Sequence, residues 1–365
     1  MTVAVVGGGL AGFVAHATLR HGGLEPGEIA VFGTEADPAG AWRRKAEAIR
    51  QHWMRSESDG HCYPTSFPGL AAREAFREKT LVPIVLTLFD QYRPTVEEFL
   101  RHVEELRARS GWDESLRLAR VERVRAVPGG FELDGRGVFR HVLLAPGHPG
   151  TALPPELEDD PRVVHAYEPH EYAGRVAIVG AGMAAATEWL NALADGAEVV
   201  SVRRRAPERR PLNLPRPLFT KRGLAAFHAA APAERAALLD ELSTPSYPPG
   251  SEWDEPVERA AAEGRFRVAA SVDGEEQVIC ATGFRRGFEH DALLRRLVDE
   301  HGLQTEGRWI VLARDSTVPA LTDATRTLSL AGAPGQWAYP AADTLAGMKY
   351  AARRFLRRVK ACRTR

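Results

Sequence analysis

Cysteine is scarce in this chain of 365 residues. Only Cys62, Cys280 and Cys362 occur, and no two of them form a CxxC pair. This scarcity excludes a disulfide-rich scaffold, and it argues equally against a zinc site and a dithiol redox centre. We therefore expect no metal site in the protein.

Long hydrophobic runs and an excess of charge of one sign are also missing. No apolar run reaches the roughly 18 residues that a membrane helix needs, and no basic segment opens the chain. Lysine plus arginine number 48 and aspartate plus glutamate number 48, so the formal net charge is zero. We expect a soluble, cytoplasmic protein that binds neither membrane nor nucleic acid, and its oligomeric state is left open.

The N-terminus carries a glycine-rich turn of the dinucleotide-binding type. Residues 3–6 predict a strand, and GxGxxG follows at Gly7, Gly9 and Gly12, before a predicted helix. Gly7 would let the chain turn, Gly9 would let the backbone approach a pyrophosphate, and Gly12 would let helix and strand pack closely. The N-terminus of the helix favours a negatively charged ligand there.

The same pattern returns at residue 176. The segment VAIVGAGMAA repeats strand and turn, with Gly180, Gly182 and Ala185 in the three positions. Two such units on one chain predict two nucleotide sites. Two glycine turns without a ligand remain the alternative.

The first unit lacks the acid that usually holds the ribose hydroxyls of the nucleotide. A strand is predicted over residues 29–32, and Gly33 stands where that acid is expected. Glu35 follows two residues later. It is therefore our candidate for the ribose contact.

The second unit carries arginines at the corresponding place. A strand is predicted over residues 198–202, and Arg203, Arg204 and Arg205 follow it. Guanidinium groups suit the 2′-phosphate of a nucleotide, so the sequence favours NADPH over NADH. A solvated basic loop is the alternative.

Further elements follow from periodicity and turn residues. Residues 94–108 predict an amphipathic helix with a threonine N-cap, and residues 116–144 predict an antiparallel meander that ends in a buried strand. A last strand is expected at 328–331 and a last helix at 340–359.

Together these motifs resemble the two-dinucleotide-binding-domain flavoproteins, and among them the flavin-containing monooxygenase group. The resemblance lies in GGGLAG, PAGAW, RPTVEEFLRHVEEL, GRVAIVGAGMAAA and CATGF, of which PAGAW looks like the GGxW of that group. A weaker likeness to the N-hydroxylating monooxygenases covers residues 218–247. There STPSY stands in place of an asparagine-rich segment.

The resemblance implies an α/β fold of two Rossmann-like domains, with the NADPH domain inserted into the FAD domain. Residues 1–170 and 279–365 would form the FAD domain, and residues 171–278 the NADPH domain. The start of the last helix would point its dipole at the flavin. The expected cofactor-binding residues are Gly7, Gly9, Gly12, Glu35, Gly40, Trp42, Ala145, Gly147, Gly283, Gly332 and Asp343 around FAD and the domain crossing, and Gly180, Gly182, Ala185, Arg203 and Arg204 for NADPH.

The implied activity is that of an NADPH-dependent flavoprotein monooxygenase. The reduced flavin would react with dioxygen to a hydroperoxide and pass one oxygen atom to a small soft nucleophile, namely an amine, a sulfur compound or a ketone. The cofactors carry this chemistry, so no catalytic side chain is assigned. The alternatives are an NAD(P)H:quinone or disulfide-type flavin reductase, and a redox sensor that binds FAD and NADPH without turnover.

Overall fold

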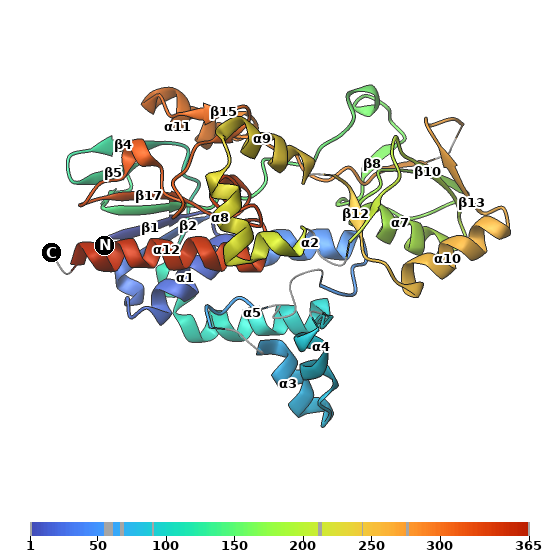
Figure 1. The fold of residues 1–365 in the computed structure, drawn as a ribbon, viewed down its shortest axis with the longest axis horizontal. Coiled ribbons are helices and arrows are strands. Elements are labelled where there is room, and N and C mark those ends of the chain that lie inside the picture. Colours follow the sequence, from blue (N-terminus) through green and yellow to red (C-terminus); the bar gives the residue numbers. More distant parts are fainter. Residues whose placement is uncertain are drawn as a thin grey trace.

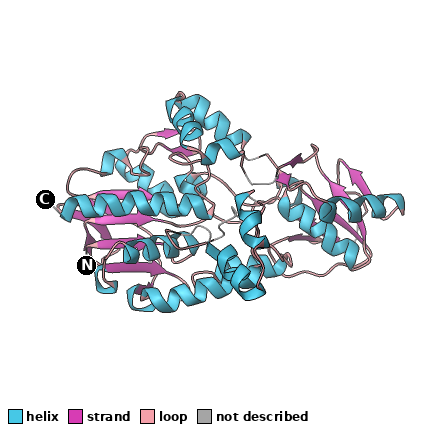
Figure 2. Cartoon of the chain, turned by 60° about the horizontal axis from the view of Figure 1, so that its bottom comes forward, coloured by secondary structure: helices cyan, strands magenta, loops and turns pink. Residues whose placement is uncertain are grey.

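The strands that precede the two glycine turns belong to separate parallel sheets, one in each lobe of the molecule (Figure 1). The computed structural model describes residues 2–54, 61–65, 69–89, 91–210, 214–242, 244–274 and 277–363. Helices lie over the strands in both lobes (Figure 2). The architecture is therefore of the α/β class, as the sequence predicts.

The first sheet has the strand order β17-β7-β1-β2-β3, and every neighbouring pair is parallel. Except for β3, its strands are buried throughout, as is typical of parallel sheets covered on both faces. The strands are β1 (Val3–Val6), β2 (Ile29–Gly33), β3 (Leu116–Leu118), β7 (His141–Leu144) and β17 (Thr327–Leu330).

Alternate residues of β1 pack into different cores. Val3 and Val5 lie in a core with residues of α1 (Leu10–His21), α5 (Val96–Ser110) and α12 (Leu345–Arg363). Ala4 and Val6 lie in the other core. That core includes residues of β4 (Val124–Val127), β5 (Gly130–Leu133), β6 (Val138–Phe139) and α11 (Ala292–His301).

The second sheet has the order β13-β10-β9-β14-β8 and is also parallel. All of its strands come between β7 and β17 in the sequence, so the chain leaves the first sheet, builds the second and returns. The strands are β8 (Val163–His165), β9 (Arg175–Val179), β10 (Glu198–Val202), β13 (Phe266–Ala269) and β14 (Gln277–Cys280), and α7 (Met183–Ala194) and α10 (Ser251–Ala262) share a core with them.

One helix of the first lobe reaches the second. The segment after α2 (Gly40–Ala48) is fixed to α7, because the Asn191 side chain donates to the Ile49 carbonyl at 2.8 Å. Arg50 and Asp195 form an ion pair next to this bond, also at 2.8 Å.

The remaining helices and strands are α3 (Gly69–Glu78), α4 (Val82–Leu88), α6 (Trp112–Ser115), α8 (Lys221–Ala229), α9 (Pro232–Glu241), β11 (Glu208–Arg209), β12 (Ser246–Tyr247), β15 (Thr305–Glu306) and β16 (Trp309–Ile310).

Several expectations about local structure are confirmed and others are corrected. Helix α5 begins after Thr95, whose hydroxyl accepts a hydrogen bond from the Glu98 N–H. The antiparallel meander is confined to β4, β5 and β6, because Leu116–Leu118 pairs in parallel with β2 instead. The last helix begins at Leu345 rather than at residue 340, because the preceding residues form turns.

Over the described ranges, no helix combines the length and apolar character needed to cross a membrane. In the same part of the chain, no group of three histidine, cysteine or acidic side chains is placed to hold a metal ion.

Candidate functional site

The first glycine turn is built so that its backbone touches neighbouring backbone. Gly7 has φ +116°, and a Cβ there would overlap the carbonyl oxygen of Ala145, the residue after β7. A Cβ on Gly12 would overlap the carbonyl oxygen of Gly7 in the same way. Both positions therefore require glycine.

The position between them faces open space. Among the described residues, apart from its neighbours along the chain, no atom lies within 4 Å of where a Cβ of Gly9 would be. Gly9 is the N-cap of α1 and makes no side-chain cap hydrogen bond, so the first N–H groups of the helix are available to a ligand. Gly332, with φ +71°, borders the same helix start, because its Cβ position is 3.3 Å from the Cβ of Ala11.

Steric crowding explains why residue 33 is a glycine. A Cβ on Gly33 would lie 2.8 Å from the Cα of Gly8, so the acid usual at this place does not fit. Glu35 lies beside the turn instead, with its backbone oxygen 3.7 Å from the Cβ position of Gly8. Its carboxylate accepts two hydrogen bonds from Arg44, at 2.5 and 2.9 Å, and the Arg44 guanidinium holds the pKa of Glu35 below its usual value.

The other residues predicted to contact FAD lie at different places around this turn. Gly40 is next to Glu35, since its Cβ position is 2.6 Å from the Glu35 carboxylate. Trp42 is half-buried and packs edge-on against Phe99, with ring centroids 5.2 Å apart. Gly147, two residues after Ala145, has a left-handed conformation with φ +85°.

The second glycine turn repeats the construction of the first. Gly180 has φ +135°, and its Cβ position is 2.6 Å from the carbonyl oxygen of Ala281, the residue after β14. Ala185 packs 3.5 Å from the same point. Gly182 is the N-cap of α7, again without a side-chain cap, and the nearest atom to its Cβ position is 3.8 Å away in Pro245.

The arginines after β10 are available to a ligand. Arg203 is partly exposed, with its guanidinium 5.5 Å from the ring centroid of Trp189, and Arg204 and Arg205 are exposed. In the described part of the chain none of the three forms an ion pair, whereas Arg209 nearby is paired with Asp254. Three guanidiniums without carboxylate partners suit an anionic ligand.

A cluster of aromatic rings lies where the chain crosses between the lobes. Gly283, with φ +80°, accepts a hydrogen bond from the Ala152 N–H at 3.0 Å. The Phe284 ring is stacked on His148, with centroids 4.2 Å and planes 11° apart, and on Tyr167, at 5.0 Å and 19°. The Lys45 ammonium lies 5.4 Å from the centroid of Phe284. Residues from four distant segments therefore meet at this crossing.

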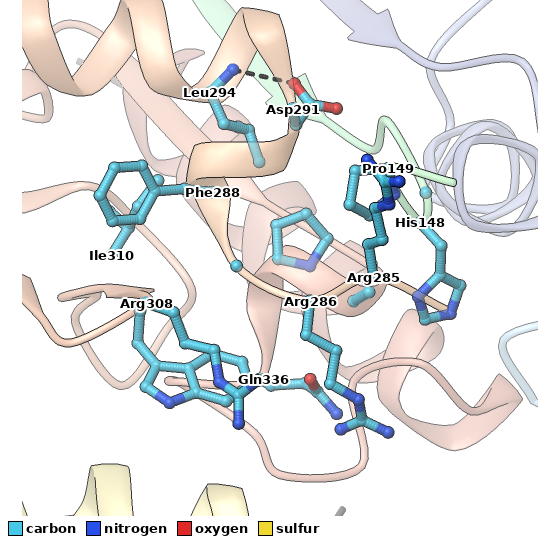
Figure 3. A pocket seen from close by; sticks show the side chains of 15 residues that line it. His148, Pro149, Arg285, Arg286, Phe288, Asp291, Leu294, Arg308, Ile310 and Gln336 are labelled. Carbon is cyan, nitrogen blue, oxygen red and sulfur yellow. Dashed lines mark hydrogen bonds between the residues drawn. The ribbon is translucent and has the colours of Figure 1, made fainter. Parts of the chain in front are cut away.

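The Asp343 carboxylate acts electrostatically on two basic residues of this region, His148 and Arg286. Burial lowers the pKa of His148, and the Asp343 carboxylate opposes this shift. Burial also lowers the pKa of Arg286, and Asp343 again opposes the shift. Figure 3 shows His148 and Arg286 at a pocket that Gln336 also lines.

Sequence reasoning did not single out His148, Lys45 or Arg286. His148 directly follows Gly147, which the predicted turn includes, and Arg286 lies two residues beyond the CATGF motif. Adjacency to these motifs is the only signal that points to them. Nothing in the sequence indicates a role for Lys45, since a charged residue inside a helix is usually solvated.

No protein-family model and no curated protein matches this sequence. Solved structures do match in fold. Ornithine hydroxylase from Pseudomonas aeruginosa gives a TM-score of 0.69 over 98% of this chain and 99% of its own, at 17% identity. The FAD-bound cadaverine monooxygenase DfoA from Erwinia amylovora gives 0.73 over 98% and 94%, at 14% identity. Bacillithiol disulfide reductase from Bacillus cereus gives 0.61 over 100% and 99%, at 13% identity.

These similarities span nearly the whole length of each chain. The fold is therefore that of the flavoproteins with two dinucleotide-binding domains. Because enzymes of different reactions share it, the fold does not select the reaction.

Proposed function

We propose that this chain is an NADPH-dependent FAD monooxygenase that acts on a small soft nucleophile. The observation that carries the proposal is the duplicated turn, in which Gly7 lies against Ala145 and Gly180 against Ala281. Each turn leads into a helix whose N-terminus has no side-chain cap. Such a helix start is an anion site, and two of them suit the phosphates of two nucleotides.

The first turn fits the pyrophosphate of FAD. The open space at Gly9 allows the ligand to approach the backbone, and the N–H groups at the start of α1 would bind it. Glu35 would hold the ribose hydroxyls from its place beside Gly8. Its bonds to Arg44 leave further lone pairs on the carboxylate, so it can accept hydroxyl hydrogen bonds while it stays paired.

The second turn fits NADPH. Gly182 and the start of α7 would bind the pyrophosphate, and Arg203 and Arg204 would bind the 2′-phosphate. The absence of ion pairs at these guanidiniums within the described ranges favours such a role over a neutralised surface loop.

The inserted domain is proposed to carry NADPH and the flanking parts to carry FAD. Strand β8 (Val163–His165) and all of β14 (Gln277–Cys280) belong to the second sheet. We therefore propose that the insertion runs from near residue 163 to near residue 280, slightly outside the range 171–278 that the resemblance implies.

Bound FAD would supply the redox chemistry, taking a hydride from NADPH and activating dioxygen. The chain supplies the surroundings. Lys45 and the start of α12 would stabilise negative charge that develops on the reduced cofactor. Burial favours the neutral form of His148, which can then donate or accept a hydrogen bond without adding charge.

The cysteines favour a monooxygenase over a reductase of disulfides. None of Cys62, Cys280 and Cys362 is joined in a disulfide within the described part of the chain, and their spacing offers no dithiol. The similar structures include an ornithine hydroxylase and a cadaverine monooxygenase. Their substrates are amines, which makes amines the first class to test.

The test is incorporation of oxygen from isotopically labelled dioxygen. Purified enzyme with NADPH is offered an amine, a sulfide and a ketone, with a quinone as alternative acceptor under anaerobic conditions. We expect one labelled atom in the product from one of the first three classes. Rapid quinone reduction without any labelled product would establish the reductase instead, and nucleotide binding without turnover would establish the sensor.

A further inference from the structure

The hairpin of α3 and α4 exposes an unusual amount of apolar surface. Ten large hydrophobic side chains are exposed in the described part of the chain, and six of them fall between residues 76 and 89. Individual exposed leucines are ordinary on protein surfaces, but contiguous patches mark binding sites. The six, here called the hairpin patch, are Phe76 (89% exposed), Leu81 (72%), Val82 (58%), Val85 (47%), Leu88 (65%) and Phe89 (67%).

Helix α4 has an inner face that is already occupied. Pro83 and Thr87 are buried, and Leu86 packs against the small cluster that contains Leu70 and Tyr92. Val82, Val85 and Leu88 recur at intervals of three along α4, and the flanking Leu81 and Phe89 are each four residues from Val85, so these five residues lie on one face. The outer face is therefore not needed for packing the hairpin, which projects from the lower edge of the molecule in Figure 1.

We propose that the hairpin patch is the contact surface of a homodimer, in which the patch of one copy covers that of a second. With about 150–250 Å² for an aromatic side chain and about 100 Å² for an aliphatic one, the exposed fractions give roughly 500 Å² of apolar surface. One side of a standard interface buries about 800 Å², of which about 60% is apolar. The hairpin patch has the apolar area that one partner contributes.

The charges around the hairpin patch favour a second copy over a lipid surface. Arg77 is held by the carboxylates of Glu78 and Glu98, at 3.1 and 2.6 Å, and α4 has no charged residue. A helix that lies on anionic lipid needs several basic residues beside its apolar face. Of the three on the hairpin, Arg73 and Arg77 are paired with carboxylates, which leaves Lys79 as the one further basic residue. Across a two-fold axis, basic residues beside the patch of one copy can face acidic residues of the other. The zero net charge of the chain also gives little repulsion between copies.

The first experiment measures the molar mass of the full chain by light scattering after size exclusion. We expect a dimer, or a tetramer built from dimers, for the wild type and a halved mass for V85E/L88E. Both substitutions lie on exposed positions, so the fold should persist, as judged by circular dichroism and the melting temperature. The matched control is V138E/V268E, which changes two exposed valines elsewhere and should leave the mass unchanged.

The second experiment shows whether the hairpin patch meets its own copy. V85E/L88E and V85K/L88K should each be of lower mass alone and should regain the wild-type mass when mixed, because opposite charges then face one another. A monomeric wild type, or acidic variants that keep the wild-type mass, would overturn the proposal. Failure of the mixture to reassociate would overturn the patch-to-patch arrangement, and co-flotation of a monomeric wild type with phosphatidylserine vesicles would assign the surface to lipid.

Discussion

Gly7 and Ala145, which follow two neighbouring parallel strands, touch through their backbones with no room for a side chain on Gly7. Gly180 and Ala281 repeat this relationship in the second sheet. In each lobe the contact fixes the turn against the end of the adjacent strand. It thereby sets the position of the helix N-terminus that follows.

Gly7→Ala and Gly9→Ala should separate folding from FAD binding. The first places a Cβ on the Ala145 carbonyl at φ +116°, which should cost roughly 2 kcal/mol or more of unfolding free energy. The second meets open space at φ −79° and should cost less than about 1 kcal/mol. Its Cβ would instead occupy the proposed path of the pyrophosphate. We expect Gly9→Ala to fold normally and to retain at most a tenth of the wild-type FAD, measured by absorbance after gel filtration.

Glu35→Gln and Arg44→Gln should differ if Glu35 holds the ribose. Both variants remove the same exposed ion pair, whose contribution to stability is small. Only Glu35→Gln also removes charge-assisted hydrogen bonds to the ribose hydroxyls, each worth about 1.5–3 kcal/mol. We expect the Kd for FAD, measured by fluorescence titration, to rise at least tenfold in Glu35→Gln and less than threefold in Arg44→Gln. Equal effects would restrict Glu35 to its pairing with Arg44.

The double variant R203Q/R204Q should lose the preference for NADPH. Removing two guanidiniums from a phosphate should raise the KM for NADPH by about 10–100-fold, while the KM for NADH stays nearly constant. R175Q is the control, because Arg175 is an exposed arginine of the same sheet that is already paired with Glu198. If both coenzymes are affected alike, the arginines do not read the 2′-phosphate.

Stability should fall as the pH is lowered from about 6.5 toward 4. Burial lowers the pKa of His61 to about 4 and that of His102 to about 3, and their rings lie 3.9 Å apart. In this range the unfolded chain binds protons that the folded chain does not, so each histidine contributes a loss of about 1 kcal/mol per pH unit. Denaturant unfolding at several pH values measures this slope. H102Q should reduce it, and H290Q, at an exposed position, should not.

Much of the fold follows from local patterns. The strand, turn and helix of each unit were predictable because the apolar run and the glycine spacing lie within one short stretch of sequence, where Gly12 packs on the Gly7 carbonyl. The N-cap at Thr95 is similarly local. The predicted antiparallel meander is wrong at Leu116–Leu118, because strand pairing depends on a partner far away in the sequence, here β2.

The composition of the crossing between the lobes could not be predicted. Lys45, His148, Phe284 and Asp343 belong to four segments that only the tertiary fold brings together. The need for glycine at position 33 could not be predicted either, because it arises from contact with Gly8, which only the fold brings close. The roles proposed for these residues and for the glycine motifs remain predictions.

The most direct test of the two-cofactor account is anaerobic mixing of the FAD-loaded protein with NADPH. We predict loss of the oxidised-flavin absorbance, faster with NADPH than with NADH, and its return when dioxygen is admitted. If the absorbance stays unchanged at saturating NADPH, the chain does not transfer a hydride from NADPH to FAD. That result would contradict the proposed function.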